Sequence, residues 1–476
     1  MRLRPIVLSC AFMLAALFLA STLFAADSTA IKISSNGRYF VDGNGKPFFW
    51  VGDTQWDLFA AFTAQNAQSV CADRRAKGFS ALQIMIYGVR GPSSANNFGQ
   101  NAWVNNNSSS LNEPYFRHID SIIDAGHANG LQMVIGVYHR SWSSITTSNA
   151  RAMATAIATR YKDKPNIMWS MYPPAENGYT ALVREAAAGL QAGDAGAHLI
   201  TVHPDPSPAS GSFWQSEPWL SFPTLQTWSS DFSNYNLTAA DYARTPVKPA
   251  VNGEARYETE GGTTPLDIRH GAWWSYLAGG FYSYGHGSNW LSPTTWQTWI
   301  NSPGANHMKV LAALLRSLSW WKLVPDQSVF SSTPGASAAA RSSDGDWVLA
   351  YLSANASATV NLGKITAADS AAAWWVDPTS GVRTKIGTYR ATGTRVFAQP
   401  NGWQDAVLLL EKSDGVTAIR RPGASQATIR PADRQMMIIG ADSRMGSPAA
   451  AMVANLRGQR VQPQAGGRLQ AVVMIR

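Results

Sequence analysis

The segment PAVNGEARYE, Pro249 to Glu258, places two carboxylates, an arginine and a tyrosine directly after an apolar run, in a chain that is only 14% charged. A carboxylate that follows a buried strand and a glycine would project into the mouth of a barrel. We predict that Glu254 is a nucleophile, with Arg256 and Tyr257 hydrogen-bonding its ionised form and keeping its pKa low. The alternative is a structural ion pair between Glu254 and Arg256. Glu258 is predicted to support Glu254 or to pair with a cation.

Hydrolysis of a glycosidic bond needs a second carboxyl group besides the nucleophile. The fourth predicted strand ends in WSMYPPAENGY, and Glu176 is the only carboxylate in that segment. Strands four and seven lie on opposite sides of an eight-stranded barrel, so Glu176 and Glu254 could face each other across a sugar. Glu176 is therefore the candidate acid/base. The alternative is a first-turn helix residue favoured by the helix dipole.

Polar and aromatic side chains also follow the other predicted strands. Asp53 closes the first strand, where it could bind sugar hydroxyls or cap the next helix. Histidines end three strands, but none has the spacing of a zinc site, and we predict neither a metal nor a cofactor. Hydrolysis by a serine is not indicated, because no Gly-x-Ser-x-Gly segment is present. The candidate substrate-binding residues are Asp53, Tyr87, His139, Trp142, Trp169, His203, Trp228, Arg256, Tyr257, Tyr284 and His286.

Short apolar runs alternate with longer amphipathic stretches and would position these side chains. Eight strands are predicted at residues 48–51, 81–86, 132–137, 166–171, 199–202, 224–227, 250–252 and 280–284. Clear helical stretches cover residues 113–129, 150–161, 179–192, 267–278 and 305–317. This order predicts an α/β fold, a (β/α)8 TIM barrel over residues 27–325. A doubly wound open sheet is the alternative, and the lack of a Gly-rich phosphate loop weakens it.

The two ends of the chain differ from the barrel. Arg2 and Arg4 precede an uncharged run to Ala26, which predicts a bacterial-type signal peptide over residues 1–26 and a secreted, periplasmic or cell-surface location. The run is long enough for an uncleaved membrane anchor as the alternative, but after cleavage no stable membrane span is expected. Residues 326–413 alternate apolar and polar side chains and predict a small antiparallel β-sandwich. The Arg-rich residues 414–476 are a basic tail, either a sorting or attachment module or disordered.

The net charge of the chain is concentrated at its ends. Of the total of +9, the tail from Asp414 onward carries +6, and Arg2 and Arg4 carry +2, which leaves +1 for the rest. A nearly neutral body argues against nucleic acid as a partner and suits a neutral or weakly charged substrate. The chain has 19 Trp, and exposed indole rings often stack on sugars. A Trp-rich core is the alternative explanation.

Five segments together resemble the apiosidase-like glycoside hydrolases of family 140: NGRYFVDGNGKPFFWVGDTQWDLF, DRRAKGFSALQIM, RYKDKPNIMWSM, PVKPAVNGEARYE and AGGFYSYGHGSNW. The resemblance covers residues 31–412 and includes the small β-domain that often follows the barrel. It implies a retaining glycosidase whose founding activity removes apiose from a side chain of a complex pectin. The family's nucleophile is the glutamate of its GE-x-x-YE pattern, which falls on Glu254.

The chain departs from the family after the fourth strand. There the family has Trp-x-x-Gly-Gly-Asp, with the aspartate as acid/base. Trp169 matches, but Tyr172, Pro173 and Pro174 occupy the Gly-Gly-Asp positions, and Glu176 lies two residues further on. This departure puts apiose specificity in question.

These observations predict a secreted retaining glycosidase that acts on plant cell-wall polysaccharide or its side chains, with a polysaccharide or oligosaccharide as its partner. Two alternatives stay open. One is a carbohydrate-binding barrel that has lost its acid/base. The other is an adhesion protein that works through the β-domain and the tail.

Overall fold

The computed structural model describes residues 30–174, 179–206, 208–288, 293–332, 335–354 and 356–414, together with 453–454 and 460–461. The predicted signal peptide, Glu176 and most of the tail therefore lie outside the described residues. The chain divides into two units, Met1–Val416 and Thr417–Arg476. In the second unit, β21 (Val453–Ala454) and β22 (Arg460–Val461) pair in antiparallel fashion.

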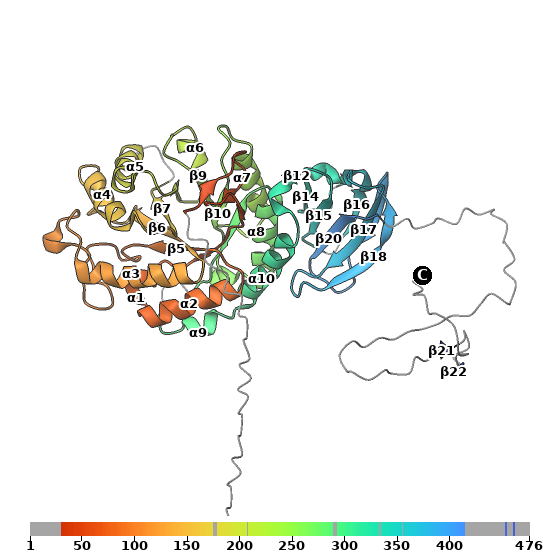
Figure 1. Ribbon diagram of the computed structural model, residues 1–476, viewed down its shortest axis with the longest axis horizontal. Coiled ribbons are helices and arrows are strands. Elements are labelled where there is room, and N and C mark those ends of the chain that lie inside the picture. The colour runs from red at the N-terminus through yellow and green to blue at the C-terminus, as the bar shows by residue number, and fades with distance from the viewer. Residues whose placement is uncertain are drawn as a thin grey trace, which may run out of the picture. The chain divides into compact units, whose positions relative to one another are not determined.

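A closed barrel of eight parallel strands forms the centre of the first unit (Figure 1). Helices surround it, so its strands are buried on both faces, and their sequences are therefore continuously apolar. This confirms the predicted TIM barrel. The strands are β4 (Val51–Thr54), β5 (Ala81–Met85), β6 (Gln132–His139), β7 (Ile167–Tyr172), β8 (Ile200–Val202), β9 (Phe222–Gln226), β10 (Val251–Glu254) and β11 (Phe281–Tyr284).

The first barrel strand begins three residues later than its apolar run predicts. Phe48 belongs instead to a separate three-stranded antiparallel sheet, which pairs β1 (Lys32–Ile33), β2 (Phe40–Val41) and β3 (Pro47–Phe48). Phe40 of this sheet packs edge-on against Phe222 and beside Trp50, with ring centroids 5.0 and 5.5 Å away. The apolar run at 48–51 thus serves two elements, which a hydrophobicity pattern does not separate.

Helices follow the barrel strands, and among those described a side-chain cap begins α2 and α8. The side chain of Thr264 accepts a hydrogen bond from the Asp267 backbone, and the Asp267 carboxylate accepts one from Thr264, a reciprocal capping box at the start of α8. The helices are α1 (Leu58–Ala61), α2 (Ala64–Ala76), α3 (Glu113–Ala128), α4 (Ala150–Tyr161), α5 (Thr180–Asp194), α6 (Gly211–Trp214), α7 (Ser233–Tyr242), α8 (Pro265–Leu277), α9 (Trp296–Trp299) and α10 (Pro303–Arg316).

A β-sandwich follows the barrel, as predicted. Its two antiparallel sheets enclose a core that includes Val348, Val360 and Leu408. The larger sheet contains β12 (Leu323–Pro325), β14 (Ala338–Ser342), β15 (Trp347–Leu352), β20 (Ala406–Lys412), β17 (Ser370–Val376) and β18 (Arg383–Arg390), and the smaller one β13 (Phe330–Ser332), β16 (Ser357–Asn361) and β19 (Thr394–Ala398).

The sandwich is joined to the barrel through helix α8. Arg269 donates two hydrogen bonds to Asp405, at 2.8 and 2.7 Å, and both side chains are less than 5% exposed. The Tyr351 hydroxyl donates to the same carboxylate at 2.7 Å. A buried bidentate pair of this kind fixes orientation, so the sandwich holds α8 in place behind the barrel.

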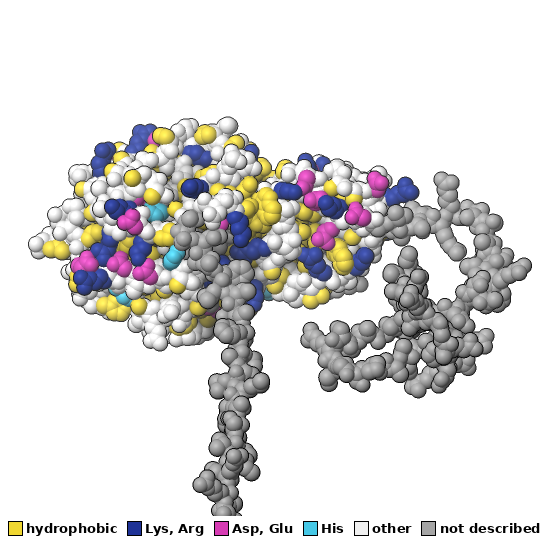
Figure 2. All heavy atoms as spheres, viewed as in Figure 1, with side chains coloured by type: hydrophobic (Ala, Val, Ile, Leu, Met, Phe, Trp, Pro, Cys, Tyr) yellow, Lys and Arg dark blue, Asp and Glu magenta, His cyan; other side chains and the backbone are white. Residues whose placement is uncertain are grey.

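On the face shown in Figure 2, cationic and anionic side chains are mixed across the surface of the barrel. Arg160, for example, pairs with both Glu113 and Asp120. None of the described helices is long and apolar enough to cross a membrane.

Candidate active site

A cavity of about 460 Å³ opens at the carboxyl ends of the barrel strands. Seven of the eight strands place a residue in its wall, either at the strand's last position or just beyond it. This is the face at which TIM barrels bind substrates. The lining residues are Trp56, Met85, Val89, His139, Arg140, Tyr172, His203, Asp205, Pro206, Gln226, Trp228, Glu254 and Tyr257.

Glu254 reaches the cavity because β10 carries an irregularity just before it. The pairing of β10 with β9 shifts register between Asn252 and Glu254, and such bulges redirect a side chain. Gly253 occupies the irregular position, where a Cβ atom would lie 2.4 Å from the Thr224 methyl carbon. The Gln83 amide donates to the Gly253 carbonyl at 2.8 Å. A glycine at position 253 is therefore a steric requirement of this strand end.

Two neighbours hold the Glu254 carboxyl group. The Trp56 indole N–H donates to the Tyr257 hydroxyl oxygen at 2.7 Å, and the Tyr257 hydroxyl donates to Glu254 Oε1. His203 Nε2 lies 3.5 Å from Glu254 Oε2. Because Trp56 can only donate, the Tyr257 proton is directed toward Glu254, and this polarity favours an ionised carboxylate.

Burial acts on Glu254 in the opposite direction and is the larger effect. It raises the pKa of Glu254 to about 8, with Tyr257 opposing and the charges of Glu260 and Asp205 adding to the rise. The predicted low pKa is therefore wrong for the free protein. Arg256 is exposed rather than directed at Glu254, so no guanidinium offsets the desolvation.

The predicted histidines His139 and His203 both line the cavity. Burial lowers the pKa of His203 to about 3 and that of His139 to about 4. Both imidazoles are therefore neutral at ordinary pH and can donate or accept hydrogen bonds. His139 Nδ1 is hydrogen-bonded to Ser141 at 2.6 Å, which leaves its Nε2 edge for other contacts.

Trp228 lies beside Glu254 in a strained conformation. Its φ of +46° is in the left-handed region, which costs free energy for a bulky residue. Its backbone N–H donates to the Glu254 carbonyl at 3.3 Å, and its ring packs edge-on against Tyr257 at 5.4 Å. Such strain clusters at functional sites, and Trp228 lines the cavity, while its substrate-binding role stays a prediction.

The structure adds a second carboxylate that the sequence reasoning missed. Asp205 lines the cavity two residues after His203 and pairs with Arg140, which follows β6. Its neighbours Pro204 and Pro206 restrict the backbone, and its N–H donates to the Pro173 carbonyl at 3.3 Å. A carboxylate directly after a strand was the signal available, as for Glu254.

Other lining residues could also have been found from their positions. They follow strands whose ends were already considered: Trp56, Met85, Arg140, Tyr172 and Gln226.

Asp53 does not line the cavity. Its side chain is fully buried and pairs with Arg74 at 3.3 Å, and Gln55 donates to it at 2.7 Å. Burial raises its pKa to about 6 against the pull of Arg74. Arg74 also donates to the carbonyl of Ile300, so Asp53 ties the barrel wall to the segment before α10.

Four predicted aromatic and histidine contacts also serve the protein core. Trp169 is fully buried and donates to Asp194 at 2.8 Å, on the helix side of the barrel wall. Tyr87 accepts a hydrogen bond from Trp103 at 3.0 Å and packs against Trp142 at 5.3 Å. His286 is 7% exposed. The structure brings none of these side chains to the cavity wall.

Tyr284 and Glu258 form a separate buried pair. The Tyr284 hydroxyl donates to Glu258 Oε2 at 2.6 Å, and the Gly304 N–H, in the first turn of α10, donates to Oε1 at 3.0 Å. Glu258 thus supports the loop after β10, and within the described residues its hydrogen bonds reach neither Glu254 nor a cation, which differs from both predicted roles. Glu176 lies outside the described residues, so no distance between Glu176 and Glu254 is given.

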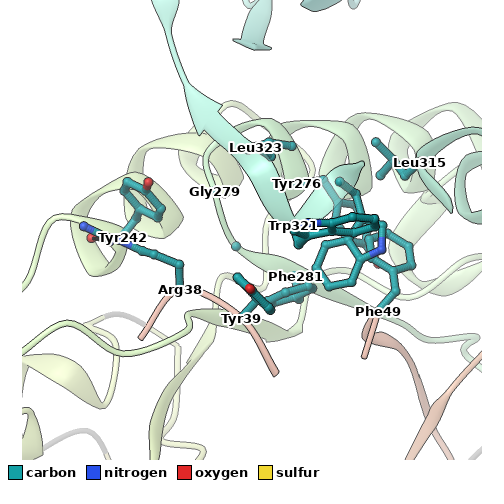
Figure 3. Close-up of a pocket in the computed structure, with 12 residues that line it drawn as sticks. Arg38, Tyr39, Phe49, Tyr242, Tyr276, Gly279, Phe281, Leu315, Trp321 and Leu323 are labelled. Atoms are coloured by element: carbon teal, nitrogen blue, oxygen red, sulfur yellow. Dashed lines mark hydrogen bonds between the residues drawn. The ribbon is translucent and has the colours of Figure 1, made fainter. Parts of the chain in front are cut away.

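A second hollow, of about 30 Å³, lies away from the strand ends (Figure 3). Arg38, Tyr39, Tyr242 and Trp321 surround it, and the Arg38 guanidinium stacks on the Tyr242 ring at 3.8 Å. That volume suffices for about one water molecule, so the large cavity is the candidate site. Within the described residues, no group of three His, Cys, Asp or Glu side chains could hold a metal ion.

The barrel and the cavity at its strand ends define a TIM-barrel enzyme, and the matches that follow make it a glycoside hydrolase. Residues 34–322 match the family described as "Apiosidase-like, catalytic domain". The match spans more than half of the chain, and the chain therefore belongs to the apiosidase-like family. Residues 324–411 match the family described as "Putative collagen-binding domain of a collagenase".

Solved structures agree with this assignment. One described as "Glycoside hydrolase" is 26% identical, with a TM-score of 0.76 over 82% of this chain and 98% of that one. A family 5 glycoside hydrolase from Bacteroides vulgatus is 25% identical, with a TM-score of 0.76 over 82% and 94%. A family 27 β-L-arabinopyranosidase from Geobacillus stearothermophilus, 11% identical with a TM-score of 0.51 over 77% and 97%, shares the fold alone. No curated protein matches the chain.

Proposed function

We propose that this glycoside hydrolase is exported and removes sugars from plant cell-wall polysaccharide or its side chains with retention of configuration. The observation that carries the proposal is Glu254, held by Tyr257 and His203 in a cavity at the strand ends. The apiosidase-like family supports a pectic substrate, and the uncharged run after Arg2 and Arg4 supports export.

In the first step, a Glu254 carboxylate oxygen attacks the anomeric carbon of the sugar. The bond from that carbon to the leaving-group oxygen breaks, and an acid donates a proton to that oxygen. In the second step, the same group, now a base, removes a proton from water. The water oxygen attacks the anomeric carbon, and the bond to Glu254 breaks.

Tyr257 has a defined part in this cycle. Its hydroxyl stabilises the carboxylate before attack, and the Trp56 indole keeps that hydroxyl directed at Oε1. His203, neutral at ordinary pH, lies beside the other oxygen. The second oxygen is therefore the one less firmly held, and we assign the attack to Oε2.

The acid/base is proposed to be Glu176, as its place after the fourth barrel strand favours. Asp205 is the second candidate, because it lines the same cavity as Glu254 and its charge acts on the Glu254 pKa. Its carboxylate pairs with Arg140.

The test measures sugar release from a panel of pectic and hemicellulosic polysaccharides by wild type, Glu176→Gln, Asp205→Asn and Glu254→Gln. Release that Glu254→Gln abolishes supports the proposal and identifies the sugar. Glu176→Ala and Asp205→Ala then identify the acid/base. The variant of the acid/base residue keeps activity on aryl glycosides with good leaving groups and is rescued by azide. A wild type that binds one polysaccharide but releases nothing favours the carbohydrate-binding alternative.

A further inference from the structure

His139 ends β6 and is part of the wall of the active-site cavity. In the closed barrel, three strands separate β6 from β10 in either direction, so His139 and Glu254 lie on opposite sides of the barrel mouth. The His139 ring packs beside Trp142 and Tyr172, with ring centroids 5.9 and 6.4 Å away. A sugar whose anomeric carbon is at Glu254 therefore has its far side toward His139.

The backbone of Ser141 determines which nitrogen of His139 carries the ring hydrogen. The Ser141 N–H donates to His139 Nδ1 at 3.2 Å, and the Ser141 hydroxyl lies 2.6 Å from the same nitrogen. A backbone N–H can only donate, so Nδ1 is the acceptor nitrogen of the imidazole. Burial, with the charge of Arg140 adding to it, lowers the pKa of His139 to about 4. At neutral pH the ring is therefore uncharged, and its one hydrogen lies on Nε2.

The Nε2–H group of His139 is a donor that no described residue uses. Both hydrogen bonds of the side chain with described residues involve Nδ1. The residue is only partly buried, and Nε2 is not one of the buried side-chain atoms that lack a partner, so it is open to the cavity. His203 differs in this respect, because its Nε2 is buried beside Glu254. Water can occupy the Nε2–H donor of His139 until an oxygen of a ligand replaces it.

We propose that His139 donates a hydrogen bond from Nε2 to an oxygen on the far side of the sugar bound at Glu254, and so selects the sugar by the direction of that oxygen. The inference rests on the proposed function and names a group that the substrate must present. Epimers of a sugar direct one hydroxyl group to opposite faces of the ring. A fixed donor that is paired by one epimer is left unpaired by the other, and such a site discriminates strongly between them.

The first test compares three substitutions of His139 on the panel's substrate. A glutamine amide nitrogen can reach the position of Nε2 and donate there, whereas the shorter asparagine reaches only the position of Nδ1. We expect His139→Asn and His139→Leu to lower kcat/KM at least about tenfold, and His139→Gln to stay within about fivefold of wild type. For a substrate analogue deoxygenated at the contacted carbon, wild type and His139→Asn should be equal.

His118 of α3 provides the matched control. Its Nε2 is hydrogen-bonded to the Phe62 carbonyl oxygen at 3.0 Å, and the residue does not line the cavity. His118→Asn and His118→Gln should leave kcat/KM unchanged. The dissociation constants of the same oligosaccharides in a Glu254→Gln background should follow the order of the His139 variants, so that a chain that binds without cleaving still tests the contact.

The second test measures the tautomer in the free protein and needs no substrate. A proton–nitrogen correlation spectrum of the imidazole groups at neutral pH, with His139 assigned by its absence in His139→Gln, should show hydrogen on Nε2 and none on Nδ1. Hydrogen on Nδ1 would overturn the inference and leave the proposed function standing.

The kinetic outcomes separate the two claims in the same way. With an active wild type, unchanged kinetics in all three His139 variants, or a His139→Gln no better than His139→Asn, overturn this inference alone. A loss of activity matched by a lower melting temperature also overturns it, because the residue then acts through the fold. A wild type that neither binds nor cleaves any glycan overturns the proposed function and this inference with it.

Discussion

Glu254 and Glu258 lie four residues apart after the same strand, and their surroundings differ completely. Glu258 is 2% exposed, and each of its carboxylate oxygens accepts a hydrogen bond, from the Gly304 N–H and from Tyr284. Glu254 is 12% exposed, receives a hydrogen bond from Tyr257 on one oxygen and has only His203, at 3.5 Å, beside the other.

The difference separates a structural carboxylate from a reactive one. Glu258 accepts a hydrogen bond from the Gly304 N–H at the start of α10, where the helix dipole favours an anion. Glu254 has no such compensation, and burial raises its pKa to about 8. Leaving Glu254 incompletely paired destabilises its charged form, but that form then has an oxygen free to react. A glutamate with both oxygens fully hydrogen-bonded, such as Glu258, would not offer one.

Glu254→Gln gives the largest expected effect. Removing a nucleophile should lower kcat by at least about a thousandfold, as measured by release of reducing sugar from the panel's substrate. Activity within tenfold of wild type would show that Glu254 is not the nucleophile.

The stability of Glu254→Gln provides its control. The folded protein binds the Glu254 proton more tightly than the unfolded chain does, because the pKa rises from 4.5 to about 8 on folding. The free energy of unfolding of the wild type therefore falls as pH rises through that range. The variant should be more stable by about 1–3 kcal/mol at pH 8 and by almost nothing at pH 4.

Glu258→Gln should show the opposite pattern. It weakens two hydrogen bonds to a buried charge, and we expect a loss of about 1–3 kcal/mol in the free energy of unfolding. Once folded, the variant should keep kcat within about tenfold. Chemical denaturation and kinetics on the same samples measure both quantities. A stable but inactive variant would assign Glu258 to the chemistry.

The pH dependence sharpens the assignment of Glu254. If its ionised form attacks, kcat/KM rises with pH through a midpoint near pH 8 and levels off above it, since burial raises the pKa of Glu254 to about 8. Tyr257→Phe removes a hydrogen bond that lowers this pKa, so its rising limb should move to higher pH. A kcat/KM that falls above pH 8 would instead identify Glu254 as the acid.

Arg256→Ala should have the smallest effect. The side chain is exposed and does not line the cavity. We expect kcat/KM to stay within about threefold of wild type. A drop of a hundredfold would restore the predicted pairing of Arg256 with the Glu254 carboxylate.

Much of this architecture can be read from the sequence. Eight apolar runs with polar ends predict the barrel, because parallel strands buried on both faces leave a strong hydrophobic signal. The Gly-Glu pair after the seventh strand predicts Glu254, and the structure places it in the cavity with His139, His203, Trp228 and Tyr257.

Other features depend on geometry that one sequence does not contain. Asp53 and Glu254 both end strands, but only the fold shows that Arg74 covers the first while a register shift turns the second into the cavity. The pKa of Glu254 is raised because it is buried, while Arg256, its neighbour in sequence, is exposed and does not offset that burial.

Trapping the glycosyl-enzyme tests the central claim most directly. Wild type is incubated with the 2-deoxy-2-fluoro glycoside of the sugar that the panel identifies, digested, and analysed by mass spectrometry. The account predicts a fluoroglycosyl adduct on the peptide that contains Glu254, and none in Glu254→Gln. An adduct on Asp205, or no adduct together with a first product of inverted anomeric configuration, would contradict it.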